Sequence, residues 1–229
     1  MLPDVIEKLR GGLIVSCQAP AESPLCDPYI IAAFALTAAQ YGAAGVRINS
    51  AAHVAAVRRR VSVPIIGIEK VVSDESEVYI TPTFDVAARL AESGADIIAL
   101  DATRRPRPRE ETLETLIRRI HDELKLPVMA DVALLEEGLH AAARGADIVA
   151  TTLCGYTEQT LHIKPPDFGL VRALAESVQV PVICEGGVRN PAQARAARNA
   201  GAFAVVVGGA ITGTDQLVRE YVGAVLAAE

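Results

Sequence analysis

The sequence predicts one (β/α)8 barrel, the TIM-barrel fold, with a short helix ahead of the first strand. The chain has 229 residues, close to the roughly 250 that such a barrel typically needs. Eight short apolar runs rich in Val and Ile alternate with Ala-rich segments of helical spacing. A doubly wound sheet is disfavoured because no Gly-rich dinucleotide turn follows the first run. We therefore expect residues 1–229 to form a single barrel domain.

The eight apolar runs are the predicted strands. They show no alternation of polar and apolar residues, which is typical of parallel strands covered on both faces. In chain order they are Gly12–Cys17, Gly45–Ile48, Val63–Ile68, Ala95–Leu100, Pro127–Ala130, Ala146–Ala150, Pro181–Cys184 and Ala202–Val207.

The segments between these runs are the predicted helices, because their apolar residues recur with helical spacing. Several of them end in Gly, which closes a helix in the left-handed conformation at little steric cost. The residues before Gly11 predict the short helix, which would cross the barrel bottom. In chain order the helices are Pro28–Tyr41, Ala51–Arg60, Thr83–Glu92, Glu110–Leu124, Leu134–Ala143, Asp167–Ser177, Pro191–Ala200 and Asp215–Ala228.

Composition and charge exclude several classes of partner. With 22 Lys and Arg against 28 Asp and Glu, the formal charge of −6 argues against nucleic acid. No apolar run is long enough to span a bilayer, and the first residues lack the basic start of a signal peptide. Four scattered cysteines predict reduced thiols and no metal site or disulfide framework. We therefore expect a cytoplasmic protein with no membrane partner.

Nearly every predicted strand ends in a polar residue or a glycine pair. In a barrel these positions converge on one pocket, whatever their separation in sequence. Solvated rim residues are the alternative reading, which a full ring of complementary types disfavours. The ring consists of Gln18, Arg47, Lys70, Asp101, Asp131, Thr151, Glu185 and the pair Gly208-Gly209.

Lys70 and Glu185 are the candidate catalytic groups. Lys70 shares strand parity with Ile66 and Ile68, and Glu185 shares it with Ile183, so both are expected to face the interior. Burial lowers the pKa of a lysine and raises that of a carboxyl group, which would make them a base and an acid. A simple ion pair between them is the alternative, and shifted pKa values alone do not separate the two readings.

Glycine pairs follow the last two predicted strands, where barrels often bind phosphate through backbone N–H groups. We therefore assign phosphate binding to Gly187, Gly208 and Gly209. Within the basic cluster of residues 104–109, Arg104 is nearest the strand and is the candidate to point inward. The four histidines fall outside strand ends, so none receives a catalytic role.

At this point the motifs resemble those of the N-acylglucosamine-6-phosphate (N-acetylmannosamine-6-phosphate) 2-epimerases, from the first strand to the last. The resemblance rests on Gly12-Leu13-Ile14-Val15-Ser16-Cys17-Gln18-Ala19, Gly67-Ile68-Glu69-Lys70, Ile80-Thr81-Pro82, Ile98-Ala99-Leu100-Asp101-Ala102-Thr103, Met129-Ala130-Asp131, Thr151-Thr152-Leu153-Cys154-Gly155-Tyr156-Thr157 and Val206-Val207-Gly208-Gly209-Ala210-Ile211-Thr212.

The resemblance implies a (β/α)8 fold, no metal or redox cofactor, an amino-sugar phosphate substrate, and a place in sialic acid and amino-sugar catabolism. It implies proton removal and return at C2 of the sugar, with Lys70 as the base and Glu185 as the acid. Gln18, Arg47 and Asp131 match positions that contact or support the substrate, and we add Arg104 and Thr151 as candidate substrate contacts.

Two departures from the family pattern lie beside the expected phosphate site. Gly213-Thr214 stands where the family usually has Arg-Pro, and Gly187-Val188-Arg189-Asn190-Pro191 stands where it tends to continue to Thr-Pro. We expect backbone N–H groups still to bind a phosphate, with Arg189 supplying the charge of the missing arginine.

Two other functions remain open on sequence grounds. Lys70 could instead be the covalent nucleophile of a Schiff-base lyase or aldolase. The barrel could also bind a sugar phosphate or a protein without catalysing a reaction. If the chain self-associates, we expect a homodimer.

Overall fold

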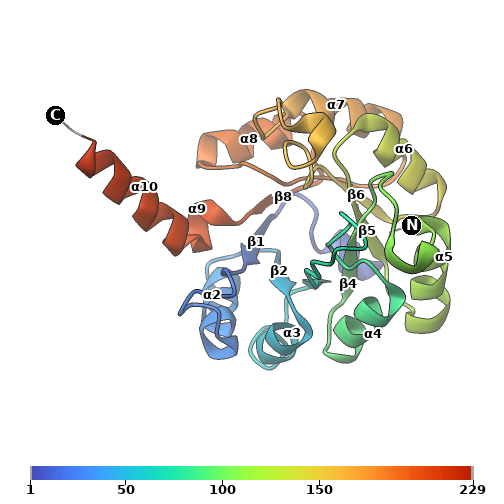
Figure 1. Cartoon of the computed structure of the whole chain (residues 1–229), viewed down its shortest axis with the longest axis horizontal. Helices are drawn as coiled ribbons and strands as arrows, with labels where there is room; N and C mark the ends of the chain where they lie inside the picture. Colours follow the sequence, from blue (N-terminus) through green and yellow to red (C-terminus); the bar gives the residue numbers. More distant parts are fainter. Residues whose placement is uncertain (1, 228–229) are drawn as a thin grey trace.

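The computed structural model describes residues 2–227, within which eight parallel strands close a barrel in sequence order (Figure 1). This confirms the predicted fold class. The strands are β1 (Leu13–Cys17), β2 (Gly45–Asn49), β3 (Ile65–Ile68), β4 (Ile97–Asp101), β5 (Val128–Asp131), β6 (Ile148–Ala150), β7 (Val182–Cys184) and β8 (Ala204–Val207).

Helices surround the barrel, and each lies close to its predicted place. Side-chain caps begin several of them, because Asp27, Thr112, Asp167 and Asn190 accept hydrogen bonds from the first helical turn. They are α2 (Pro28–Gln40), α3 (Ala51–Arg58), α4 (Phe84–Glu92), α5 (Leu113–Arg119) with the π-turn η2 (Ile120–Leu124), α6 (Leu135–Ala143), α7 (Phe168–Ser177) and α8 (Pro191–Asn199); single 3-10 turns are η1 (Pro108–Glu110) and η3 (Glu158–Thr160).

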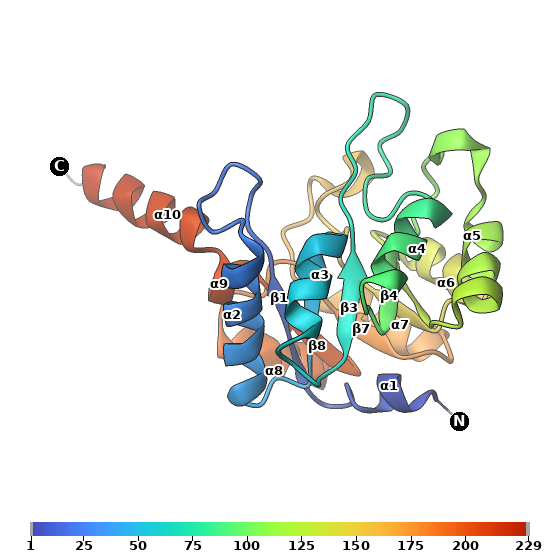
Figure 2. The ribbon, with the colours of Figure 1, turned by 90° about the horizontal axis from the view of Figure 1, so that it is seen from below.

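The apolar core consists of a barrel interior and an outer layer under the helices. Inward side chains such as Ile66, Ile68 and Ile183 fill the interior, as strand parity predicts, while their neighbours along each strand pack under the helices. The short N-terminal helix α1 (Asp4–Glu7) crosses the barrel bottom, where Ile6 and Leu9 plug the interior (Figure 2). The longer loops extend from the opposite end, which is the functional end of a barrel.

The last helix departs from the arrangement that the repeat predicts. The predicted helix Asp215–Ala228 is α10 (Thr214–Leu226), with Ala228 outside the described residues, and the short helix α9 (Gly209–Thr212) precedes it. Instead of lying on the barrel, α10 projects away from the wall between α2 and α8 (Figure 1). It buries no side chain. Sequence periodicity predicts that a helix has an apolar face, but it does not say what covers that face.

Within residues 2–227, no helix has both the length and the apolar character needed to cross a membrane.

A histidine–aspartate pair joins η2 to the segment before β6 at the bottom of the barrel, and it predicts a pH effect on stability. His121 Nε2 lies 2.8 Å from Asp147 Oδ2, which also accepts the backbone N–H of Val128 at 2.8 Å. The hydrogen bond to Asp147 raises the pKa of His121 above its ordinary value. Because the folded state holds the His121 proton more tightly, protonation of His121 stabilises the fold. This contribution to the free energy of unfolding is complete below the unfolded-state pKa of about 6.5, and it is lost as the pH rises through the folded-state pKa.

We therefore expect His121→Gln to destabilise the protein more at pH 5.5 than at pH 9. The difference should stay under about 1 kcal/mol because both side chains are partly exposed and screened by solvent. Urea unfolding at the two pH values measures it, with His162→Gln, a change at an exposed loop histidine, as the control. A loss of stability that is equal at both pH values would contradict the assignment.

Candidate active site

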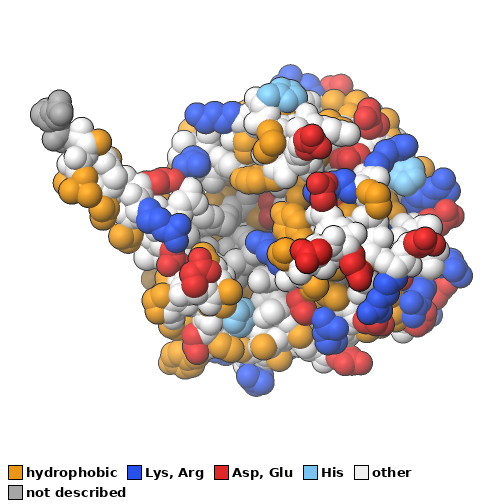
Figure 3. Space-filling view, viewed as in Figure 1, with side chains coloured by type: hydrophobic (Ala, Val, Ile, Leu, Met, Phe, Trp, Pro, Cys, Tyr) orange, Lys and Arg blue, Asp and Glu red, His pale blue; other side chains and the backbone are white. Residues whose placement is uncertain are grey.

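A cavity of about 540 Å³ opens at the carboxyl ends of the strands. Figure 3 shows a hollow on the side of the barrel mouth from which the projecting C-terminal segment leaves. Eight of the residues proposed from the sequence line the cavity wall: Gln18, Arg47, Lys70, Glu185, Gly187, Arg189, Gly208 and Gly209. The structure thus brings together residues that lie almost 200 positions apart in the chain.

Arg47 is the organising residue of the cavity floor. It lies in the middle of β2, its side chain points into the barrel, and that side chain is 1% exposed. Its guanidinium group donates two hydrogen bonds to Asp131, at 3.0 and 2.6 Å, and one of 2.7 Å to Glu185. Asp131 also accepts a 2.6 Å hydrogen bond from Thr152 Oγ1. A buried arginine needs such partners because its charge has lost its hydration.

Glu185 is held rigidly at the end of β7. Thr151 on the neighbouring chain segment donates its hydroxyl to the Glu185 carbonyl at 2.9 Å and accepts the Glu185 N–H at 3.1 Å. The Glu185 side chain is 12% exposed. Burial raises its pKa to about 7, although Arg47 acts in the opposite direction. A substantial fraction of Glu185 can therefore carry a proton at neutral pH.

Lys70 lies across the cavity from Glu185, two residues after the end of β3. Its backbone N–H donates to Asn49 Oδ1 at 3.0 Å, which fixes the chain where it leaves the strand. The surrounding protein lowers the pKa of Lys70, and the positive charge of Arg47 lowers it further. Glu185 forms its ion pair with Arg47, and among the described residues no contact of 4.0 Å or less joins it to Lys70. The arrangement does not support the simple Lys70–Glu185 ion pair.

Three residues proposed as substrate contacts do not line the cavity. Asp131 is fully buried behind Arg47, and Thr151 is turned toward the backbone of Glu185. Arg104 is exposed, and its backbone N–H donates to Glu137 on α6. It is the next residue, Arg105, that turns back and pairs with Asp101 at 2.6 Å.

The structure also places residues in the cavity wall that the sequence did not single out. The hydroxyl of Thr151 is hydrogen-bonded to the backbone of Glu185. The side chain that faces the cavity is therefore that of the next residue, Thr152. Tyr79 comes from the long loop after β3, where no periodicity marks an inward residue. Burial raises the pKa of Tyr79, and the negative charge of Asp131 raises it further, so its hydroxyl stays a hydrogen-bond donor. Further polar residues of the wall that were not singled out include Ser16, Tyr156, Gln216 and Glu220.

Within residues 2–227, no group of three or more His, Cys, Asp or Glu side chains is arranged to hold a metal ion.

Lys70 and Glu185 line the same cavity, and their surroundings shift their pKa values toward one another. A lysine with a lowered pKa can accept a proton, and a glutamic acid with a raised pKa can donate one. The hollow between them is lined by hydrogen-bonding groups that suit a polar substrate. Two groups with pKa values shifted in this way suit proton transfer.

The chain is similar to a family of known proteins. Residues 31–227 match the family model described as "Putative N-acetylmannosamine-6-phosphate epimerase". Two proteins named "Putative N-acetylmannosamine-6-phosphate 2-epimerase" are similar over nearly their whole length. That of Thermosynechococcus vestitus is 55% identical, over 96% of each chain. That of Caldanaerobacter subterraneus is 42% identical, over 97% of this chain and 94% of its own.

A solved structure is similar as well. The N-acetylmannosamine-6-phosphate 2-epimerase from Clostridium perfringens is 38% identical, with a TM-score of 0.92 and 96% of each chain covered. The family model and these relatives show that the chain belongs to the N-acetylmannosamine-6-phosphate 2-epimerase family.

Proposed function

We propose that this enzyme interconverts N-acetylmannosamine 6-phosphate and N-acetylglucosamine 6-phosphate by inverting C2 of the sugar. The observation that carries the proposal is the pair formed by Lys70 and Glu185, which line one cavity with pKa values shifted in opposite directions. The names of the relatives supply the substrate.

The proposed reaction proceeds through an enolate of the open-chain aldehyde. The neutral amine of Lys70 takes the proton from C2, and the electrons of the C–H bond form a C1–C2 double bond while O1 gains the negative charge. Glu185 then delivers a proton to the opposite face of C2, which restores the aldehyde with inverted configuration. Lys70 is left protonated and Glu185 ionised, and proton exchange with solvent restores both. No hydride or electron acceptor takes part.

Arg47 and Asp131 serve this step as positioning residues. Arg47 holds the Glu185 carboxyl group at 2.7 Å, and Asp131 and Thr152 fix Arg47 in turn. A group held by such a network reaches its target without reorganising, which is where much of the rate of an enzyme originates.

The experiment that tests the proposal follows both epimers by proton NMR after enzyme is added to N-acetylmannosamine 6-phosphate. We expect N-acetylglucosamine 6-phosphate to form until equilibrium is reached. Borohydride added with substrate should trap no protein–sugar adduct, because the proposed route contains no imine. A trapped adduct on Lys70 would favour the lyase or aldolase instead, and binding without turnover would favour a barrel that only binds sugar phosphates.

The proposed setting is the cytoplasm, in amino-sugar and sialic acid catabolism. All four cysteines are free among the described residues, and three of them are buried. Unpaired thiols agree with a reducing compartment.

We further propose that the enzyme is a homodimer in which α10 packs against the second copy. The apolar residues Val218, Tyr221, Val222, Val225 and Leu226 are each at least half exposed. They recur at spacings of three and four residues, so they form one face of the helix, and Figure 3 shows apolar side chains along the projecting segment. Apolar patches of this kind mark interaction sites. We favour a second copy of the chain as the partner of this apolar face. Each chain extends α10 away from its own barrel, so the wall between α2 and α8 is not covered by its own α10.

Light scattering after size-exclusion chromatography tests the dimer. We expect the unmodified protein to have twice the mass of one chain, and the double variant Val222→Glu/Val225→Glu to have the mass of one, because two charges then sit on the apolar face. Leu139→Glu, on the exposed part of α6, controls for added surface charge. A monomeric unmodified protein, or a double variant that still dimerises, would contradict this proposal.

A further inference from the structure

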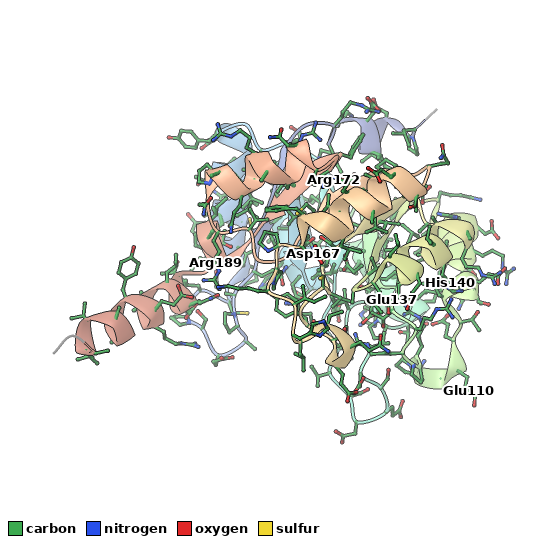
Figure 4. The ribbon with its side chains drawn as sticks, turned by 90° about the horizontal axis from the view of Figure 1, so that it is seen from above. Glu110, Glu137, His140, Asp167, Arg172 and Arg189 are labelled. Carbon is green, nitrogen blue, oxygen red and sulfur yellow. The ribbon has the colours of Figure 1, made fainter. Side chains whose placement is uncertain are left out.

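The cavity wall has a third cationic side chain besides those of Arg47 and Lys70. Among the described residues that line it, the cations are Arg47, Lys70 and Arg189. Arg47 is committed to Asp131 and Glu185, and Lys70 is assigned to the proton transfer. Arg189 comes from the loop after β7, on the side of the barrel from which α10 leaves (Figure 4). It is thus the cation available to a part of the substrate other than the reacting carbon.

The wall beside Arg189 is built so that an anion can approach the backbone. Gly187, Gly208 and Gly209 line it and have no side chains to shield their peptide groups. Gly187 has φ +67°, and a Cβ there would lie 2.4 Å from the carbonyl oxygen of Pro165, so a side chain does not fit. At Gly213 a Cβ would lie 2.6 Å from the carbonyl oxygen of Gly209. This backbone therefore leaves no room for a cationic side chain at position 213.

Arg189 is already paired, with a carboxylate of α10. Its Nη1 lies 3.3 Å from Glu220 Oε1, and the same oxygen accepts a 2.7 Å hydrogen bond from Gln216. Gln216 and Glu220 are four residues apart, so they share the face of α10 that lines the cavity, whereas Val218 and Val222 lie on another face. The Arg189 and Glu220 side chains are 63% and 46% exposed. An ion pair this exposed is weak, and a doubly charged phosphate can replace the carboxylate.

We propose that Arg189 discriminates the phosphorylated sugar from the free sugar, and that Glu220 occupies Arg189 until the phosphate displaces it. This inference rests on the proposed function. It assigns α10 two faces with separate tasks: an apolar face toward the second copy and a polar face that supplies the competing carboxylate at the phosphate end of the cavity.

The test compares kcat/KM for N-acetylmannosamine 6-phosphate with that for N-acetylmannosamine. In Arg189→Ala we expect the ratio of the two values to fall on the order of 10- to 100-fold, the effect of losing one charged hydrogen-bond partner. In Glu220→Gln we expect the ratio to rise several-fold through a lower KM for the phosphorylated sugar, because the competing charge is gone. Arg195→Ala, at an exposed arginine of α8 outside the cavity wall, should leave the ratio unchanged.

Inhibition by inorganic phosphate gives a readout that does not depend on turnover of the free sugar. Phosphate should compete with the substrate, and its inhibition constant should rise in Arg189→Ala and fall in Glu220→Gln. An unchanged ratio and an unchanged inhibition constant in Arg189→Ala would overturn the inference while leaving the epimerase intact. A fall of the ratio in Glu220→Gln would overturn the role given to Glu220. Absence of epimerisation from the unmodified enzyme would instead refute the proposed function.

Discussion

Lys70→Met should lower the rate of C2 proton exchange by about 10²- to 10⁴-fold, the usual effect of removing a positioned acid or base. Methionine preserves much of the length of the side chain but cannot accept a proton. Because Lys70 lies at the accessible mouth of the barrel rather than in the packed interior, the fold should persist. Proton NMR of the sugar phosphate in deuterated water measures the exchange.

Two controls make this result specific to Lys70. Lys164→Met, at an exposed lysine in the loop after β6, should retain normal exchange. Circular dichroism should show that the Lys70→Met variant melts like the unmodified protein. A folded Lys70→Met enzyme whose exchange is only two- or three-fold slower would rule out Lys70 as the base.

Glu185→Gln should produce a loss of similar size, about 10²- to 10⁴-fold in kcat, with little change in KM. The amide keeps the shape of the carboxyl group and can still accept the hydrogen bond from Arg47, but it cannot deliver a proton. Removing a group that acts in the transition state lowers kcat, whereas removing a group that only binds the substrate raises KM.

The pH profile of Glu185→Gln separates the two roles further. Activity of the unmodified enzyme should rise with pH as Lys70 loses its proton, and fall again as Glu185, whose pKa is raised to about 7, loses its own. The amide variant should keep the rising limb and lose the falling one. A variant with a raised KM, normal kcat and both limbs would show that Glu185 binds the substrate without acting as the acid.

Most of the fold could be predicted because the strands of a parallel barrel are buried on both faces. A run such as Ala204–Val207 is readily predicted as a buried parallel strand once seven similar runs precede it. Strand parity then places Lys70 and Glu185 at the mouth, since a register shift of one residue would move every side chain to the other face. The same logic brings Gln18, Arg47 and the glycine pairs to the cavity.

The parts that escaped prediction depend on contacts that a local pattern does not contain. Thr151 and Thr152 are adjacent, as are Arg104 and Arg105. Only the folded barrel shows that Thr152 is the threonine that lines the cavity and that Arg105 is the arginine that pairs with Asp101. Likewise Asp131 reaches the cavity only through Arg47, from a strand 84 residues away along the chain. The position of α10 depends on packing beyond its own sequence, which helical periodicity does not encode.

The measurement that tests the central claim most directly is the origin of the hydrogen at C2 of the product. N-acetylmannosamine 6-phosphate is converted in deuterated water, and the C2 signals of both epimers are followed by proton NMR from the first turnovers. Because Lys70 removes the proton and Glu185 returns one from the opposite side, the account predicts one deuterium at C2 in every molecule of N-acetylglucosamine 6-phosphate formed. Product that retains the original C2 hydrogen from the first turnovers would contradict it.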